Sequence, residues 1–258
     1  IETYSLGEFP DAQKIEFSKN KNFGKSTSGS IGKLYYNLFG INKLVDNLDI
    51  FHSTIFSLPY NLKAKKKIIT IHDFAFNRFP DMFDFKTRMF YKLTLDYSIK
   101  KADRIICISK SCLEDFKTYY PDPNLVSKTR LVYNGFNDYS TFEQSSVHIN
   151  SFGDYLLCVG ASHKRKNFIR VLEAYSILSK KYPKLNLVVT GTIDPEILSN
   201  ILNEDSPIRQ RVFIRNYVSE NELVNLYRGA KVLMFPSLYE GFGFPILEAM
   251  SCKIPVLT

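Results

Sequence analysis

The sequence of 258 residues has no tryptophan, and its four cysteines include no Cys-x-x-Cys pair. Their spacing fits neither a zinc site nor the dense framework of a disulfide-bonded miniprotein. Cys107 and Cys158 lie within apolar runs, where a cysteine behaves as a small buried hydrophobe. These features exclude a zinc module and a disulfide scaffold, and they favour a reducing, cytoplasmic location.

Long apolar runs are also missing. No stretch approaches the roughly 18 apolar residues of a membrane-spanning helix, and no secretory signal peptide opens the chain. Ile1 is not an initiator methionine and Thr258 lies within an apolar run, so we expect the sequence to be trimmed at both ends. The content of 45% hydrophobic and 23% charged residues is that of a soluble globular protein rather than a disordered or collagen-like chain.

The charged residues are unequal in sign, because 34 Lys and Arg against 26 Asp and Glu give a net charge of +8. A basic surface favours anionic partners such as phosphates, nucleic acid or an acidic membrane face. A solvated, lysine-rich surface explains the same charge equally well. Because the sequence contains no zinc knuckle, RNA-recognition sequence or helix-turn-helix signature, we expect no nucleic-acid partner.

Short β-branched apolar runs alternate with helical stretches from residue 48 onward. The runs are continuous rather than alternating, which is typical of parallel strands covered on both faces. We expect strands at 50–53, 67–71, 104–109, 129–133, 155–160, 185–190, 212–214 and 232–236. Strands that alternate with helices in this way predict an α/β fold with doubly wound parallel sheets.

Helices are expected between these strands. Apolar residues at three- and four-residue spacing predict helices over 85–101 and 167–181. Capping patterns mark three further helix starts, Ser111-x-x-Glu114, Asp194-Pro195 and Ser219-x-x-Glu222.

One polar stretch, 136–153, interrupts the alternation of strands and helices. We place a domain boundary there, which gives two α/β units in series, 1–148 and 149–258, the first without its opening strand. Near the N-terminus, 19–30 is expected to be a mobile basic loop and 31–44 a helix.

The strongest functional pattern follows the last predicted strand. Gly241 and Gly243 leave the backbone bare, and Pro245 stands where proline prefers to begin a helix. Free N–H groups at such a helix start bind anions. Glu240 and Glu248 frame the site, and because they would repel a phosphate, we expect each to meet hydroxyls of a sugar or a ribose. A tight strand–helix turn alone explains one Glu and one Gly, but not both pairs.

A second group follows the strand predicted at 155–160. Three cations, Lys164, Arg165 and Lys166, stand after Gly160 and before a helix. Cations at a helix N-terminus oppose its dipole at a cost of about 0.3–1 kcal/mol each, and a bound diphosphate would turn that cost into a gain. A solvated basic loop is the simpler explanation of this segment taken alone.

A third group, His72 and Asp73, follows the strand predicted at 67–71. In most sequences such a pair forms a local hydrogen-bonded turn. Its position, expected to face the second domain, makes a catalytic pair an equally good explanation.

These segments together resemble the retaining glycosyltransferases of family 4, which have the GT-B fold. The resemblance is carried by Glu-x7-Glu at 240–248 with Gly-Phe-Gly-Phe-Pro inside it, Arg-Lys-Asn at 165–167 and Thr-Ile-His-Asp at 70–73. It extends over about residues 49–258 and points to the mannosyltransferase-like group. It implies two Rossmann-like, doubly wound domains facing across a cleft, both incomplete in this sequence. The first would bind the acceptor and the second a nucleotide sugar.

The resemblance also implies roles for single residues. Glu240 would contact the donor sugar, and His72 would reach the same sugar from the first domain, which makes these two the expected catalytic residues. Arg165 and Lys166 would neutralise the departing diphosphate. Ala161 stands where many members carry an arginine, which places more of the phosphate load on Arg165.

Other residues would hold the donor. By the same resemblance, Glu248 would bind the ribose hydroxyls, and backbone near Tyr217 and Val218 would edge the base. Bare backbone would approach the sugar and the diphosphate. The remaining donor-binding positions are Gly160, Gly241, Phe242, Gly243 and Phe244.

Family members retain the configuration of the transferred sugar. The sequence has no Asp-x-Asp motif, which in glycosyltransferases of another fold holds a metal ion. We therefore expect no metal and no cofactor besides the nucleotide-sugar substrate, with a GDP- or UDP-linked sugar as donor and a saccharide or lipid-linked acceptor.

Two alternatives concern function and place. A catalytically silent homologue, serving as scaffold or partner subunit, would have no need to keep Glu240, Glu248, Arg165 and Lys166. The lysine clusters at 63–67 and 19–25 would suit peripheral contact with an anionic membrane at the inner face of the plasma membrane. A solvated loop explains either cluster as well.

Overall fold

The computed structural model describes residues 4–5, 13–14, 48–142, 152–193 and 208–258. The predictions for 19–30, 31–44 and Asp194-Pro195 lie outside the described residues, and the stretch 136–153 lies only partly within them. Among described residues, the chain forms two compact units that interleave in sequence. The first comprises residues up to Ile71, Met89–Ile106 and Ser127–Arg130, and the second comprises His72–Arg88, Cys107–Val126 and Leu131–Thr258. The division into 1–148 and 149–258 stays a prediction.

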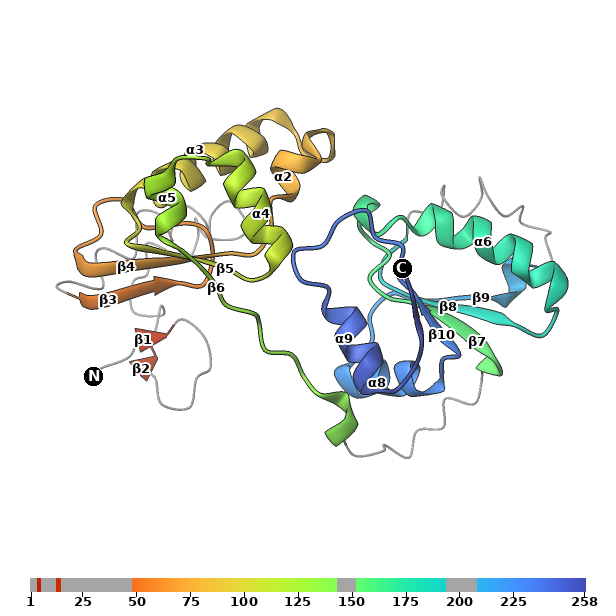
Figure 1. The fold of residues 1–258 in the computed structure, drawn as a ribbon. Coiled ribbons are helices and arrows are strands. Elements are labelled where there is room, and N and C mark those ends of the chain that lie inside the picture. The colour runs from red at the N-terminus through yellow and green to blue at the C-terminus, as the bar shows by residue number, and fades with distance from the viewer. Residues whose placement is uncertain (1–3, 6–12, 15–47, 143–151, 194–207) are drawn as a thin grey trace, which may run out of the picture. The chain divides into compact units, whose positions relative to one another are not determined.

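One sheet has the strand order β3-β4-β5-β6 (Figure 1). Its strands are β3 (Leu48–Ser53), β4 (Ala64–Ile71), β5 (Arg104–Cys107) and β6 (Thr129–Leu131). β3 and β4 pair in parallel, with His52 opposite Ile68. A separate parallel pair joins β1 (Tyr4–Ser5) to β2 (Gln13–Lys14).

The other sheet has the strand order β11-β10-β7-β8-β9, and all its pairs are parallel. Its strands are β7 (Tyr155–Cys158), β8 (Asn186–Thr190), β9 (Val212–Arg215), β10 (Val232–Met234) and β11 (Val256–Leu257). The first of these strands in sequence is central, and the chain leaves it first to one side and later to the other. This order is that of a Rossmann sheet.

The described helices alternate with the strands, as the sequence predicts. The α-helices are α2 (Ala75–Arg78), α3 (Phe85–Lys101), α4 (Lys110–Tyr119), α5 (Pro123–Ser127), α6 (Phe168–Lys181), α8 (Glu220–Gly229) and α9 (Phe244–Ser251). Single 3-10 turns are η3 (Pro80–Met82), η4 (Tyr139–Thr141), η6 (Lys164–Lys166) and η7 (Arg209–Arg211). None of the described helices is long and apolar enough to cross a membrane.

Helices cover both faces of the second sheet, because successive side chains of a strand point to opposite faces. Leu157, at 0% exposure, packs in a cluster with residues of α8 and α9. Its neighbours Leu156 and Cys158 pack in a second cluster with residues of α6. Figure 1 shows the same layers, with α6 on one side of the strands and α8 and α9 on the other. The predicted doubly wound arrangement is confirmed for this sheet.

Most predicted elements are confirmed within a few residues. The predicted helix 85–101 matches α3, and Ser219 caps α8 by accepting a hydrogen bond from the Glu222 N–H at 3.3 Å. The capping box at Ser111 is wrong. Ser109 is the cap of α4 and accepts from the Cys112 N–H at 3.0 Å, because β5 ends at Cys107 and Ser109 is already extended.

Candidate active site

Strand order determines where the second sheet can bind a ligand. The chain runs from β7 through β8 to β9 on one side and returns through β10 to β11 on the other. In such sheets ligands bind beyond the carboxyl ends of the two strands at this switch point. The segments that follow β7 and β10 are the two loops in which the sequence predicts donor-binding residues.

The loop after β7 begins with a left-handed turn. Gly160 has φ +73°, a conformation that strains residues with a side chain. The N–H of Ala161 donates to the Thr190 carbonyl at 3.0 Å, so the loop starts against the end of β8. The turn η6 then carries the predicted cations, and Asn167, at φ +57°, leads into α6.

Three hydrogen bonds to backbone carbonyls join this loop to the loop after β10. The Leu238 N–H donates to the Arg165 carbonyl at 2.8 Å. The Asn167 side-chain amide donates to the Pro236 carbonyl at 3.2 Å, and the Arg165 guanidinium donates to the Tyr239 carbonyl at 3.2 Å. The two loops therefore form one structure at the switch point.

Glu240 lies between two cations of this structure. Its Oε2 atom is 2.8 Å from Arg165 Nη1, and its Oε1 atom is 2.8 Å from Lys166 Nζ. The exposed fraction of the side chain is 26% for Arg165, 11% for Lys166 and 19% for Glu240. Water therefore screens these charge interactions only in part. Two positive charges against one negative charge leave an excess cation in a half-buried position.

The pKa of Glu240 reflects these neighbours. Burial raises the pKa, but the ammonium of Lys166 and the guanidinium of Arg165 outweigh that effect and hold it below its ordinary value. Glu240 is thus a carboxylate at neutral pH. The Lys166 ammonium also lies 4.5 Å from the centre of the Phe235 ring, at a cation–π distance.

The glycine pair of the loop has two distinct roles. Gly243 precedes α9 at φ +93°, so the predicted helix start at Pro245 is confirmed within one residue. Gly241 lies against another segment: a Cβ atom there would collide with the His72 carbonyl oxygen and lie 3.0 Å from the Asp73 Cβ. Only glycine allows this approach without a shift of one backbone or the other.

This contact brings two predicted catalytic segments together. His72 is exposed, directly beyond the end of β4, and its carbonyl faces Gly241, the residue after Glu240. Phe242 and Phe244, whose backbone is predicted to approach the donor, follow in the same loop. Their ring centres are 5.0 Å apart, and Phe244 is 39% exposed.

Glu248 has a different environment from Glu240. It lies on α9 and accepts a hydrogen bond from the Tyr227 hydroxyl at 2.7 Å. Burial raises its pKa, and the negative charge of Glu220 adds to this, while the Tyr227 hydrogen bond and Lys166 lower it. This half-buried carboxylate has a hydroxyl donor and no ion pair among the described residues, which suits recognition of further hydroxyl groups.

Tyr217 and Val218 lie beyond β9, two strands away from β7 at the same edge of the sheet. Tyr217 is 89% exposed, while Val218 packs partly against the core. The structure therefore places them at the margin of the switch point, whereas it joins Arg165, Lys166 and Glu240 directly.

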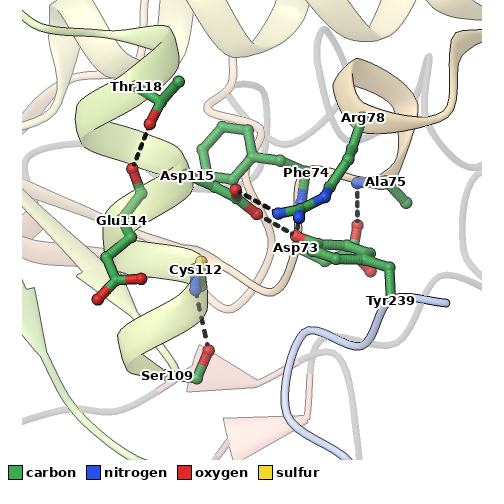
Figure 2. Close-up of polar contacts among 10 residues, drawn as sticks. All are labelled: Asp73, Phe74, Ala75, Arg78, Ser109, Cys112, Glu114, Asp115, Thr118 and Tyr239. Carbon is green, nitrogen blue, oxygen red and sulfur yellow. Dashed lines mark hydrogen bonds and ion pairs between the residues drawn. The ribbon is translucent and has the colours of Figure 1, made fainter. Parts of the chain in front are cut away.

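Three residues that support the Glu240 loop were not predicted from the sequence. Figure 2 shows Tyr239 beside Asp115 and Arg78, with its hydroxyl donating to the Asp115 Oδ2 atom at 2.7 Å. Asp115 comes from α4, 124 residues away in sequence. No spacing rule connects such distant positions, so the sequence carries no signal of this pairing.

Among the described residues, no group of three or more His, Cys, Asp or Glu side chains could hold a metal ion. Metal independence stays a prediction.

Two family models match the chain in succession. Residues 13–138 match the model described as Glycosyltransferase Family 4, and residues 141–258 match Glycosyl transferases group 1. The chain is 31% identical over 194 residues to the O-antigen chain mannosyltransferase RfbU of Salmonella typhimurium. That match covers 75% of this chain and 52% of RfbU, so the chain spans about half the length of this relative.

Solved structures show the same fold. WaaG, a glycosyltransferase involved in lipopolysaccharide biosynthesis, aligns with a TM-score of 0.62 at 17% identity, over 98% of this chain and 70% of WaaG. Anabaena HepE, solved in complex with UDP and glucose, aligns with a TM-score of 0.53 at 18% identity, over 74% of this chain and 52% of HepE.

The two parallel sheets and these matches define the class: the fold is that of the GT-B glycosyltransferases. Together with the relative named above, the two family models support a glycosyltransferase of this type.

The contrast between the two glutamates predicts opposite effects of pH on stability. Glu248→Gln is expected to raise the free energy of unfolding at pH 7. The folded-state pKa of Glu248 lies above its ordinary 4.5, so ionisation destabilises the wild-type fold as pH rises through that interval. The gain should vanish below about pH 4.5. Urea unfolding at pH 4 and pH 7 measures it.

Glu240→Gln is the matched comparison. The folded-state pKa of Glu240 is lowered, so its ion pairs contribute stability above the ordinary 4.5 that is lost as pH falls through the folded value. This variant should therefore be less stable than wild type at pH 7 and approach it in acid. If both variants changed the free energy of unfolding at pH 7 in the same direction, the opposite pKa shifts assigned to Glu240 and Glu248 would be contradicted.

Proposed function

We propose that this chain forms the catalytic part of a retaining, metal-independent glycosyltransferase. The enzyme would move a hexose from a nucleoside-diphosphate donor to a saccharide or lipid-linked acceptor. The observation that carries this proposal is the excess cation at the switch point, where Arg165 and Lys166 share one carboxylate. A half-buried excess positive charge just before the start of α6 favours an anion.

The charge cluster suits the departing diphosphate. As the bond between the anomeric carbon and the phosphate oxygen breaks, positive charge develops on the sugar ring and negative charge on the diphosphate. Arg165 and Lys166 are held in place by hydrogen bonds and ion pairs before any ligand arrives. Such preorganised charges stabilise developing charge without further rearrangement, which a metal ion does in other enzymes.

Glu240 has two tasks in this proposal. Without donor it pairs with both cations and offsets one of their two charges, and with donor the diphosphate pairs with the cations and frees the carboxylate for hydroxyls of the sugar. His72 is placed beside the same loop by its contact with Gly241. In the retaining reaction the acceptor hydroxyl attacks the face that the diphosphate leaves, and its proton passes to the leaving phosphate oxygen.

The rest of the donor would lie along the carboxyl edge of the sheet. Glu248, with its hydroxyl-bonded carboxylate, is proposed to bind the ribose. Backbone at Gly160 and at the start of α9 would contact the diphosphate, and backbone near Tyr217 and Val218 would edge the base. GDP- and UDP-hexoses are the proposed donors, since RfbU is named a mannosyltransferase and HepE was solved with UDP.

Nucleotide binding provides the first test. A thermal-shift titration of the protein with GDP, UDP, TDP and ADP, without added metal, should show stabilisation by one nucleotide. Saturation at 100 times the dissociation constant adds about 2.7 kcal/mol, which is several degrees for a chain of this size. Arg165→Ala should abolish the shift.

Arg170→Ala is the control for that titration, because Arg170 lies on α6 and pairs only with Glu173 at the surface in the described contacts. Its shift should equal that of wild type. A shift that survives Arg165→Ala, or no shift with any nucleotide, would contradict the proposed donor site.

Turnover separates an enzyme from a silent homologue. Glu240→Gln should lower the transfer rate by about 100-fold or more, as expected for loss of one preorganised polar group. Glu222→Gln is the control. Glu222 lies on α8 and pairs with Arg215 of β9 at 2.8 Å, and its substitution should leave the rate unchanged. An active wild type with an equally active Glu240→Gln variant would remove Glu240 from the mechanism.

We also propose peripheral contact with an anionic membrane on the cytoplasmic side. On α3, Phe85, Met89 and Leu93 stand four residues apart on one face and are 71%, 42% and 58% exposed. Lys86 and Lys92 flank them and are exposed. This face supports the proposal better than the lysines at 63–67, because Lys65 and Lys66 already pair with Asp49 and Asp103.

Sedimentation with liposomes tests that contact. Replacing Phe85 and Leu93 together by Ser should lower the partition onto vesicles with anionic lipid by about tenfold or more, since burial of each side chain contributes about 1.5–3 kcal/mol. Ile177→Ser is the control, because Ile177 is 70% exposed on α6. If the bound fraction does not depend on the anionic lipid content, or is unchanged by the double substitution, the proposal is contradicted.

A further inference from the structure

Tyr239, the residue directly before Glu240, makes two hydrogen bonds with its hydroxyl group. It accepts from the Phe74 N–H at 2.9 Å and donates to the Asp115 Oδ2 atom at 2.7 Å (Figure 2). The residue is 6% exposed. Burial raises the pKa of the hydroxyl, so it stays protonated and keeps its role as a donor at neutral pH.

Arg78 completes the group around Tyr239. Its Nη1 atom donates to the Asp115 Oδ1 atom at 3.1 Å, and its guanidinium carbon lies 5.3 Å from the centre of the Tyr239 ring. The Asp115 side chain is only 10% exposed, so this carboxylate depends on its two donors. One tyrosine is thereby joined to a residue of α2 and a residue of α4.

The same two segments meet a second time. Two residues before Phe74 stands His72, whose carbonyl faces Gly241. Two residues after Tyr239 stands that Gly241, so the segments 72–74 and 239–241 meet at two points, one through the Tyr239 side chain and one through backbone. Glu240 lies between the two contact points of its segment and His72 lies at one of them, so the tyrosine hydroxyl helps to fix the separation of the two residues proposed to act on the donor sugar.

We propose that Tyr239 is a positioning residue. Through its hydrogen bonds to Phe74 and Asp115, it fixes the positions of Glu240 and His72 relative to each other and to the donor sugar. This inference rests on the proposed function. It assigns the tyrosine no contact with substrate, and it separates positioning from diphosphate binding, which depends on Arg165 and Lys166.

Tyr239→Phe removes the hydroxyl and keeps the ring. Its effect is measured as release of nucleoside diphosphate from GDP-mannose and UDP-glucose, with product affinity measured alongside. We expect kcat to fall by about 10- to 100-fold, the cost of a small misplacement of reacting groups. The KM for donor and the affinity for nucleoside diphosphate should stay within about twofold, because the cations are untouched.

The matched control is Tyr155→Phe. Tyr155 is 1% exposed, and its hydroxyl donates to the Leu226 carbonyl at 2.8 Å, at the opposite end of the sheet from the switch point. Both variants lose one buried hydroxyl, so both should lower Tm. A purely structural role for Tyr239 predicts the same kcat for both, and that result would overturn the proposal.

Asp115→Asn tests the coupling. The amide keeps the volume and one acceptor oxygen but weakens the pairing with Arg78. If both residues act through one network, the double variant Tyr239→Phe/Asp115→Asn should lose little more kcat than Tyr239→Phe alone. Fully multiplicative losses would overturn the network.

Hydrogen exchange gives a readout that needs no activity. In Tyr239→Phe, the Phe74 amide and the amides of 237–243 should exchange faster than in wild type, and in Tyr155→Phe they should not. Unchanged exchange overturns the inference even in an inactive protein. An inactive wild type with the expected exchange would instead count against the proposed function and leave the anchoring role of Tyr239 supported.

Discussion

The candidate site depends on one interaction, the pairing of Glu240 with both Arg165 and Lys166. It lies where the second sheet reverses its strand order. Burying charges is costly, and it is tolerated only where geometry and further hydrogen bonds compensate. Here Glu240 reaches Arg165 and Lys166 at 2.8 Å each, and the Arg165 backbone and side chain also bond to the loop that carries Glu240. The loop after β7 and the loop after β10 therefore stabilise each other.

This arrangement follows from topology. Because β10 pairs directly with β7, the loops at their carboxyl ends are neighbours although about 75 residues separate them in sequence. A strand order without the reversal would place another loop beside the cations. The Gly243 turn and α9 then hold Glu248 on the same side, where burial raises its pKa and no cation pairs with it among the described residues. In the free protein, the charge of Glu240 is balanced by cations, whereas Glu248 has only the Tyr227 hydroxyl as a described hydrogen-bond donor and is proposed to bind hydroxyl groups of the donor.

The sequence predicted much of this from local patterns. Continuous apolar runs located the strands from β3 to β10, and periodicity located α3 and α6 within about a residue. The Ser111 cap failed because two serines, Ser109 and Ser111, each precede a helical pattern, and only the end of β5 decides between them. The strand β11 was missed because two residues are too short for a pattern.

The site was predictable only in its local part. Glycines, cations and carboxylates near strand ends are visible in the sequence, whereas their pairing is not: Arg165 and Lys166 were expected beside a diphosphate, and the structure shows them on Glu240. Tyr239 escaped notice because its partners Phe74 and Asp115 stand 165 and 124 residues away. Such contacts depend on tertiary structure, which no spacing within one loop encodes.

The central claim is that Arg165 and Lys166 exchange Glu240 for the phosphates of a nucleotide. Phosphorus NMR of a nucleoside diphosphate titrated with the protein in the presence of a metal chelator observes this most directly. The account predicts that both phosphate resonances shift on binding, and that Lys166→Met reduces the shift of the phosphate nearest the sugar site. Binding that leaves the phosphate resonances unmoved, or that requires a metal ion, would contradict it.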